Sequence, residues 1–335
     1  MNGITAYGAY IPRARLSKQA MAETNAWFDA GLKSLGKGER SICNWDEDTI
    51  TMAVEAASAC RAAMGDQSVS ALYLASTTFP FLDRQNSVVV AEALNMDRTL
   101  RTMDIGGSQR AATSALIALL EGSDETSALL VASEHRRSKA GSRAEMLWGD
   151  AAAAVAVGSD NVIAEVLGIE TLAVDFVDHY RGDEASFDYG WEERWIRDEG
   201  FMKSVPTAVI ALFEKCSVSS EEIDHFILPT DQARTPIGLA RKLGIDGDAV
   251  VDNQISNVGV TGAAQSILLL VKTLEQAKAG DLILVTGFGQ GCDAILLRAT
   301  KAITDFKPAQ GVSSALAARR EETNYNKFLS FNNLI

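Results

Sequence analysis

The chain contains one structural plan twice, and this internal repeat constrains the fold more than any other sequence feature. In the first copy, residues 108–116 begin a helix-like run that ends near Glu121, and the apolar segment 128–133 follows a short polar loop. In the second copy, residues 259–268 begin a helix-like run and the apolar segment 281–287 follows. Small residues in the first turn let a helix lie deep between sheets, and strands that are apolar on both faces need cover on both. The repeat therefore predicts two buried helices flanked by sheets.

The elements that precede each copy also agree in their order. Apolar periodicity predicts a helix, a strand and a second helix before each copy. These are expected near residues 48–64, 71–76 and 85–94 in the first half, and near 203–215, 225–228 and 234–243 in the second half. The sequence thus predicts an α/β protein built from two duplicated halves.

The length of the chain agrees with two halves. At 335 residues it exceeds the size at which a single core usually divides. We divide it into an N-terminal half (residues 1–165), a C-terminal half (residues 166–303) and a C-terminal tail (residues 304–335).

The tail combines a short helix expected near 311–320 with four closely spaced apolar residues, Tyr325, Phe328, Leu329 and Phe331. Such a spacing is not typical of a tail that faces solvent. Two interpretations remain open: the tail binds a partner chain, or it folds back onto its own body.

The glycine-rich segment 287–292, with the sequence GFGQGC, has the composition of a dinucleotide-binding loop. A phosphate-binding loop needs the N-terminus of a helix after it, whereas residues 293–297 have the pattern of a strand. The segment is therefore interpreted as a turn between the last two strands, near a site where only glycine lets the backbone approach closely.

The charge balance argues against a nucleic-acid partner. With 31 basic and 44 acidic residues, the chain has a net charge of −13, which opposes attraction to phosphate backbones. A phosphorylated ligand remains possible, because the basic segment 135–139 can act locally within an acidic protein.

The four cysteines, at positions 43, 60, 216 and 292, stand singly, so neither structural disulfides nor a metal site is expected. The sequence has no apolar run of eighteen residues, and its first residues lack the basic and apolar regions of a signal peptide. We expect a cytoplasmic protein without a membrane partner.

Three features together resemble the hydroxymethylglutaryl-CoA synthase family: the duplication, residues 45–57, and the sequence GFGQGCDA at 287–294. The resemblance covers about residues 1–300. It implies the thiolase-like fold shared with ketoacyl synthase III, in which sheets and helices form five layers (α-β-α-β-α) and the central helices are buried. It also implies a homodimer that handles acyl-CoA thioesters, with a coenzyme A thioester as ligand and no tightly bound cofactor.

Within that family, residues 178–181 and 191–200 look like a divergent bacterial branch that is joined to, or works with, an OB-fold protein. This likeness implies OB-fold and thiolase-like partner proteins.

Members of the family carry a cysteine at the N-terminus of the first central helix, where the helix dipole lowers the pKa of the thiol and the thiolate attacks a thioester. The resemblance places Gln109 at that position, and an amide cannot form an acyl-enzyme. Ser108, one residue earlier, is a weak alternative nucleophile because the sequence shows no base beside it.

Two further family residues are replaced. Asp231 stands where the family has a histidine that stabilises charge on a thioester oxygen, and an ionised carboxylate would repel such charge. The general acid/base glutamate should fall within residues 76–80, where no carboxylate occurs and Thr78 is the nearest polar substitute. The resemblance places Asn257 as the retained asparagine of the family site.

Each of these residues also has a structural interpretation. Gln109 can satisfy buried backbone groups, Asp231 can cap the helix that begins near Arg234, and Asn257 can occupy a turn. His135, His179 and His225 are interpreted as structural rather than catalytic. We expect the acyl-CoA pocket to involve Arg110, Arg234, Gly259 and Gly289.

Two functions follow as hypotheses. One is an acyl-CoA-handling subunit of a complex that forms or cleaves carbon–carbon bonds, in which a cysteine-independent variant uses Gln109 in place of an acylated cysteine. The other is a non-catalytic scaffold that keeps the fold in order to assemble a multienzyme complex.

Overall fold

The computed structural model describes residues 2–122, 127–318 and 320–335. Its main sheet has nine strands in the order β11-β12-β13-β8-β1-β7-β6-β4-β5. The N-terminal half contributes β1 (Gly3–Tyr10), β4 (Val69–Ala75), β5 (Arg101–Ile105), β6 (Ser127–Glu134) and β7 (Ala151–Gly158). The C-terminal half contributes β8 (Ala164–Ala173), β11 (His225–Ile227), β12 (Leu282–Phe288) and β13 (Gly291–Ala299).

The two halves of the sheet repeat one pattern of strand pairing. In the first half, β4 is parallel to β6, and β6, β7 and β1 follow as antiparallel neighbours. In the second half, β11 is parallel to β12, and β12, β13 and β8 follow as antiparallel neighbours. Within the main sheet, the two halves are joined where Gly3 and Ile4 of β1 pair with Glu165 and Ala164 of β8. The duplication inferred from the sequence is therefore confirmed.

Each half of the sheet is covered on both faces, as its apolar strands require. Along β6, Leu130 and Ala132 face the central core, while Leu129 and Val131 face the outer core under α2 (Thr49–Met64). Along β12, Ile283 and Val285 face the same central core, and Leu284 faces the core under α7 (Met202–Cys216).

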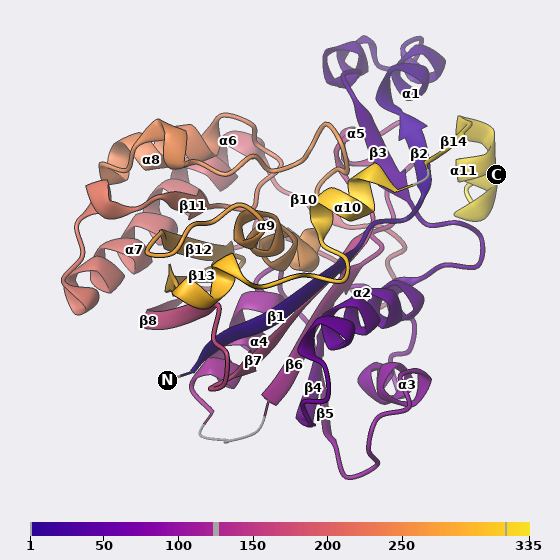
Figure 1. Ribbon diagram of the computed structural model, residues 1–335. Coiled ribbons are helices and arrows are strands. Elements are labelled where there is room, and N and C mark those ends of the chain that lie inside the picture. The colour runs from indigo at the N-terminus through magenta and orange to yellow at the C-terminus, as the bar shows by residue number, and fades with distance from the viewer. Residues whose placement is uncertain (1, 123–126, 319) are drawn as a thin grey trace.

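Two helices fill the space between the halves of the sheet. These are α4 (Ala111–Leu120) and α9 (Gln265–Leu274), whose buried side chains belong to the central core. Outside them lie α2 with α3 (Asn86–Ala93) on one side and α7 with α8 (Thr235–Leu243) on the other. Figure 1 shows the resulting sequence of helix, sheet, helix, sheet and helix. The five-layer arrangement predicted from the resemblance is confirmed.

The close contact between α4 and β12 depends on a glycine. A Cβ atom added at Gly287 would lie 2.2 Å from Oγ1 of Thr113, one turn into α4. Only a residue without a side chain lets the strand and the helix approach this closely.

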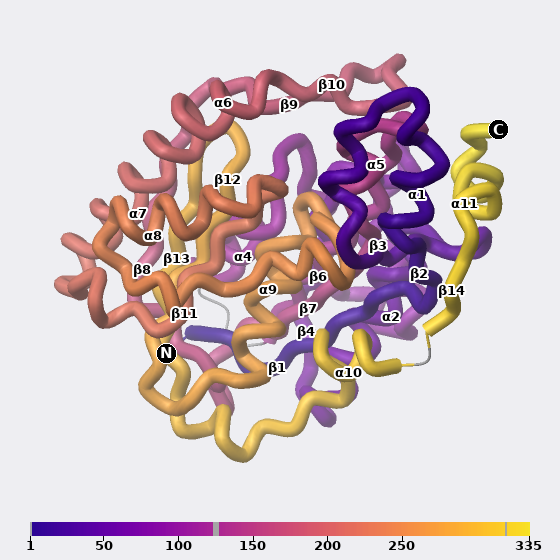
Figure 2. The backbone as a smooth tube through the Cα atoms, turned by 90° about the horizontal axis from the view of Figure 1, so that it is seen from above, coloured from indigo at the N-terminus to yellow at the C-terminus, as the bar shows by residue number. Residues whose placement is uncertain are grey.

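The tail folds back onto its own body, which confirms one of the two interpretations drawn from the sequence. Strand β14 (Glu321–Thr323) pairs with β2 (Ala14–Ser17), which also pairs with β3 (Glu39–Ile42). Tyr325, Phe328 and Leu329 are buried in a core that they share with residues of this small sheet. Figure 2 shows the C-terminal helix alongside β2 and β3. These three side chains are therefore not free to bind a partner.

The remaining helices and strands are short. They are α1 (Lys18–Asn25), α5 (Arg143–Leu147), α6 (Glu193–Trp195), α10 (Val312–Ala317), α11 (Tyr325–Phe331), β9 (His179–Tyr180) and β10 (Tyr189–Gly190). Short 3-10 helices lie at Ala30–Leu35, Ser220–Glu222, Gly247–Ala249, Gly262–Ala264 and Lys301–Thr304, and a π-helical turn lies at Ile196–Phe201. Among the helices of the described chain, none combines the length and the apolar character needed to cross a membrane.

One connection positions the candidate site. After β8 the chain leaves the sheet, forms the β9–β10 hairpin and α6, and returns to the body through α7. We name residues 174–200 the crossing segment, because Figure 2 shows it running across the molecule between α7 and the region of α5. It lies over the N-terminal ends of the central helices.

Candidate functional site

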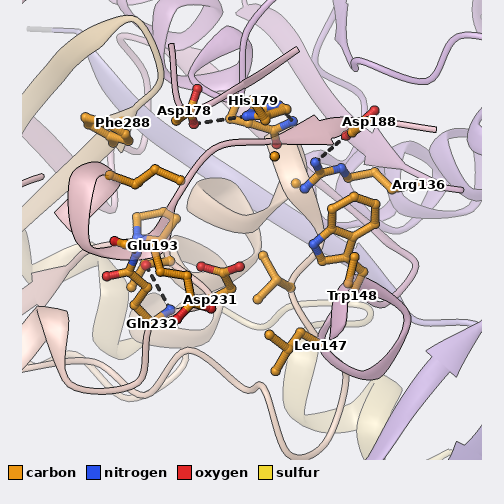
Figure 3. A pocket seen from close by; sticks show the side chains of 18 of the residues that line it. Arg136, Leu147, Trp148, Asp178, His179, Asp188, Glu193, Asp231, Gln232 and Phe288 are labelled. Atoms are coloured by element: carbon orange, nitrogen blue, oxygen red, sulfur yellow. Dashed lines mark hydrogen bonds and ion pairs between the residues drawn. The ribbon is translucent and has the colours of Figure 1, made fainter. Parts of the chain in front are cut away.

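A cavity of about 300 Å³ lies at the N-terminal end of α4. Its wall combines Gln109 from the start of α4, His179 from the crossing segment, Asp231 from the turn before α8, Trp148 after α5, and Phe288 at the end of β12. Figure 3 shows His179 and Asp231 on opposite sides of this space. Both halves of the chain therefore contribute to one cavity.

A second cavity, of about 310 Å³, adjoins the first and is lined by Thr77, Ser108, Arg181 and Gln290 among others. The two cavities share four lining residues, Gln109, Asp178, His179 and Asp188. These four side chains therefore form the wall between an inner apolar space and an outer polar one.

The side chain of Gln109 lies in this shared wall, as the sequence alignment with the family motif predicted. Its Nε2 atom lies 3.2 Å from Nε2 of His179 and donates to Oγ1 of Thr77 at 3.5 Å. Its Oε1 atom is buried and has no hydrogen-bond partner among the described residues. The amide thus keeps one unused acceptor, which a ligand with a hydrogen-bond donor can satisfy.

His179 is held by an acidic neighbour. Its Nδ1 atom lies 3.0 Å from Oδ2 of Asp178. The Gln109 amide nitrogen can only donate, so Nε2 of His179 accepts, and the ring proton lies on Nδ1 toward Asp178. Sequence reasoning interpreted His179 as structural. The one signal that pointed to this arrangement was the aspartate immediately before the histidine.

Ion pairs between one aspartate and two arginines hold the crossing segment in place over the cavity. Asp188 accepts from Arg136 at 2.5 Å and from Arg181 at 2.7 Å. Arg181 also donates to the backbone oxygen of Thr77, and the guanidinium of Arg136 lies 3.6 Å from the centre of the Trp148 ring. Burial alone would raise the pKa of Asp188, but Arg136 and then Arg181 outweigh it and lower this pKa. The carboxylate therefore stays ionised and keeps both arginines in place.

Asp231 differs from its sequence-based interpretation in two ways. It does not cap α8, because the N-cap residue is Arg234 and no side chain makes a capping hydrogen bond there. Burial, which exceeds the opposing effect of Arg136, raises the pKa of Asp231 above its ordinary value. The pKa of this carboxyl group is thus shifted toward the protonated form, which can donate a hydrogen bond.

A carboxylate lies where the sequence indicated none. Glu134, at the end of β6, is fully buried and accepts hydrogen bonds from the backbone and hydroxyl of Thr77 and from the hydroxyl of Thr78. It also accepts from the backbone N–H of Ala263, just before α9, at 3.0 Å. Thr78 therefore bonds Glu134 instead of facing a cavity. The carboxylate links the first half of the chain to the second directly beneath the site.

The Ser108 side chain stabilises the turn before α4, and its hydroxyl is not placed as a nucleophile. Its hydroxyl donates to the backbone oxygen of Gly289 at 2.9 Å and accepts from the N–H of Arg110. A Cβ atom at Gly289 would lie 2.6 Å from Oγ of Ser108, so glycine is needed for this approach. Both residues line the outer cavity.

The other expected pocket residues lie outside both cavities. Arg110 pairs with the buried carboxylate of Asp293 on β13 at 2.9 Å and lines neither cavity. Asn257 is exposed in a turn and donates to Gln254, which agrees with its structural interpretation. Arg234 is exposed at the start of α8. Gly259 packs against the backbone of Trp148, which a Cβ atom would meet at 2.7 Å.

None of the four cysteines, all of which belong to the described chain, lines either cavity. Burial raises the pKa of the Cys60 and Cys292 thiols, and burial together with Asp150 raises that of Cys43. A buried thiol with a raised pKa is a poor nucleophile.

Cys43, His135 and Asp150 form a group that the sequence spacing did not indicate. One potential ligand atom from each lies within 4.8 Å of the others, so the set is able to hold a metal ion. The three residues already interact with one another without a metal ion. Asp150 accepts from the backbone N–H of Cys43 at 2.8 Å and pairs with His135 at 3.1 Å. Burial by itself would lower the pKa of His135, but Asp150 outweighs it and raises this pKa.

Comparison with known proteins defines the class first. The fold superposes on "MvaS in complex with 3-hydroxy-3-methylglutaryl coenzyme A" with a TM-score of 0.84 at 18% identity, covering 98% of this chain and 91% of that one. It superposes on 3-oxoacyl-(acyl carrier protein) synthase III, FabH, from Pseudomonas aeruginosa with a TM-score of 0.79 at 24% identity, covering 90% and 98% of the two chains. The model of the 3-oxoacyl-[acyl-carrier-protein] synthase III C-terminal family matches residues 213–298. The fold is thus the thiolase-like α/β fold.

The sequence comparisons identify the family within this class. The chain is 30% identical over 336 residues to the hydroxymethylglutaryl-CoA synthase of Aeropyrum pernix, covering 97% of this chain and 92% of the relative. It is 26% identical to the enzyme of Methanobrevibacter smithii, covering 99% and 98%. The chain belongs to the hydroxymethylglutaryl-CoA synthase family, whose members are acyl-CoA-condensing acyltransferases.

Proposed function

We propose that this chain binds an acyl thioester of coenzyme A in the cavity at the head of α4 and takes part in forming or cleaving a carbon–carbon bond without an acyl-enzyme. In this proposal the chain is a subunit that works with other proteins. The ligand follows from relatives: one similar structure is a synthase with 3-hydroxy-3-methylglutaryl coenzyme A, and another is a synthase "complexed with CoA".

The single observation that carries the proposal is the side chain at the head of α4. Gln109 lies in the wall of the cavity, where the family resemblance expects a cysteine, and its Oε1 atom is buried without a partner among the described residues. An amide cannot be acylated, but its nitrogen can donate to the oxygen of a thioester that stays attached to coenzyme A, and its oxygen can accept from an N–H group of that ligand. In this proposal, residue 109 binds the thioester, whereas the cysteine of the family attacks it.

Asp231 supports the same function from the opposite wall. A carboxyl group whose pKa is raised by burial donates a hydrogen bond when protonated, and a donor stabilises charge that develops on a thioester oxygen. We propose this role for Asp231 in place of the histidine of the family.

Mass spectrometry tests the proposal. Native spectra of the chain mixed with acetyl-CoA, acetoacetyl-CoA or hydroxymethylglutaryl-CoA are expected to show bound thioester, because the cavity has about 300 Å³ of space and the Gln109 amide nitrogen in its wall can donate to a thioester oxygen. Denaturing spectra of the same samples are expected to show the unmodified chain, since no cysteine lines the cavities. A stable acyl increment on any cysteine would contradict the cysteine-independent mechanism. If no native spectrum shows bound thioester, the alternative function is favoured, in which the chain is a non-catalytic scaffold of a multienzyme complex.

We further propose that the functional form is a homodimer joined through the first half of the chain. Strand β5 is an edge strand of the sheet, and large apolar side chains near it are exposed, including Leu82 (88%), Val88 (45%) and Met103 (45%). An edge strand beside exposed apolar residues is a favourable pairing surface.

Light scattering is expected to give twice the mass of one chain, and Met103→Lys is expected to shift the protein toward the monomer by adding a charge at this edge. The matched control is Ile237→Lys, at another exposed apolar residue, on α8. A monodisperse wild-type monomer would contradict the dimer. OB-fold and thiolase-like partners are proposed from the family resemblance, and copurification with such proteins tests them.

A further inference from the structure

Each of the three histidines in the chain is paired with a carboxylate. His135 pairs with Asp150, His225 with Asp281 at 3.0 Å, and His179 with Asp178 at 3.0 Å. His179 alone among the three lies in the wall shared by the two cavities at the head of α4. One acid–base pair is therefore placed where an acyl thioester would bind.

We propose that His179 is the proton-transfer residue of this chain, acting on the carbon next to the thioester carbonyl, and that Asp178 is the positioning residue that holds its tautomer. This inference depends on the proposed function, because it requires an acyl thioester in the cavity. The proton-transfer and positioning roles therefore belong to two residues of the crossing segment, and not to residues at the N-terminal end of either central helix.

The geometry fixes which nitrogen of the ring is reactive. Asp178 holds the proton on Nδ1, so the lone pair of Nε2 faces Gln109 and the cavity. The contact between Nε2 and the Gln109 amide is 3.2 Å, and Gln109 has a second donor contact to Thr77 at 3.5 Å. A substrate C–H group can take the place of the Gln109 amide at Nε2 of His179. The displaced amide N–H is then free to donate to the thioester oxygen.

The proton-transfer step needs no other reactant. Nε2 accepts the proton as the C–H bond breaks, and the electron pair delocalises onto the thioester oxygen to give an enolate. The imidazolium keeps its Nδ1–H bond to Asp178, whose negative charge balances it. Return of the proton to carbon regenerates the thioester, so exchange of hydrogen with solvent is the simplest sign of the step.

The charges around His179 allow this role. The nearby carboxylate of Asp188 is already paired with Arg136 and Arg181, so Asp178 is the carboxylate that contacts the ring. The side chain of Asp178 is 14% exposed and that of His179 is 23% exposed, which leaves the ring accessible from the outer cavity.

Deuterium exchange tests the inference. Wild-type protein in D₂O is expected to incorporate deuterium at the acetyl methyl group of acetyl-CoA, followed by mass spectrometry of the thioester. His179→Ala is expected to reduce the exchange rate by about 100-fold or more, the usual effect of removing a general base, while thioester binding persists. Added imidazole is expected to restore part of the rate to His179→Ala, which a merely structural role would not allow.

Two further variants complete the design. Asp178→Asn keeps the side-chain volume but no longer holds the His179 proton on Nδ1. It is expected to slow exchange by about 10-fold or more, without loss of binding. His225→Gln is the matched control, because it breaks a similar histidine–aspartate pair far along the sheet at β11 and is expected to leave exchange unchanged.

The outcomes separate this inference from the function on which it depends. If acetyl-CoA does not bind in native spectra, the proposed function fails and the inference fails with it. If acetyl-CoA binds but wild type does not catalyse exchange, or if folded His179→Ala exchanges at the wild-type rate, only the role of His179 is overturned.

Discussion

Replacing Asp188 with alanine is expected to lower the free energy of unfolding by about 3–5 kcal/mol, because it leaves a buried arginine without its anion. The side chain of Asp188 is 5% exposed and that of Arg136 is 7% exposed, so water cannot replace the lost carboxylate. The crossing segment loses its attachment to Arg136 and its internal pair with Arg181, and thioester binding is expected to weaken as the cavity wall loosens. Urea unfolding and native mass spectrometry measure the two effects.

A matched control lies in the same segment. Asp198 pairs with Arg197, but both side chains are about half exposed, and water screens such a pair, so it contributes little to stability. Asp198→Ala should therefore unfold close to wild type. Equal stabilities of Asp188→Ala and Asp198→Ala would contradict the fastening role of Asp188.

The same carboxylate sets an acid limit for the site. The pKa of Asp188 is lower in the folded protein than the value of about 4 expected in an unfolded chain, so its stabilisation is complete above about pH 4. The stabilisation is lost as pH falls through the lowered folded pKa. Asp188→Ala should show less acid-induced loss of stability than wild type over that range.

Replacing Glu134 with alanine is expected to cost roughly 2–6 kcal/mol, since the backbone N–H groups of Thr77 and Ala263 would each lose a buried acceptor at about 1–3 kcal/mol. The carboxylate is fully buried and also accepts from the hydroxyls of Thr77 and Thr78. Thioester binding should weaken as well, because Glu134 connects the turn at Thr77 to the start of α9.

Glu134→Gln is the informative companion variant. An amide of nearly the same shape keeps one acceptor oxygen but turns the other position into a donor, which faces N–H groups. Its unfolding free energy should lie between those of wild type and Glu134→Ala in urea denaturation. An alanine variant as stable as wild type would show that Glu134 does not hold the two halves together at the site.

The sequence predicted part of the candidate site. Gln109 could be placed at the head of the first central helix because small residues and a helical pattern follow it directly. Asp231 could be placed beside the cavity because it follows a recognisable strand and precedes a helix. Both inferences depend on local pattern, which determines where an element begins.

The same reasoning failed where position depends on packing. Asn257 fits a family pattern, yet its turn carries the side chain into solvent, so a local match did not ensure a place in the cavity. Arg110 follows Gln109 directly, but the turn of the helix directs it toward Asp293 instead of the ligand space. Adjacent residues on a helix face different directions, and the packing around the helix decides which one meets a cavity.

The sequence by itself determined the duplicated α/β plan, the buried central helices and the presence of a glycine turn between the last two strands. Apolar periodicity and glycine placement are local properties, and strands that are apolar on both faces can be satisfied only between two layers. Only the tertiary structure decided that Glu134 supplies a carboxylate beneath the site, that His179 meets Gln109, and that burial raises the pKa of Asp231. These properties arise where segments far apart in the chain converge, and the water they exclude and the charges they bring together are not encoded in any short stretch of sequence.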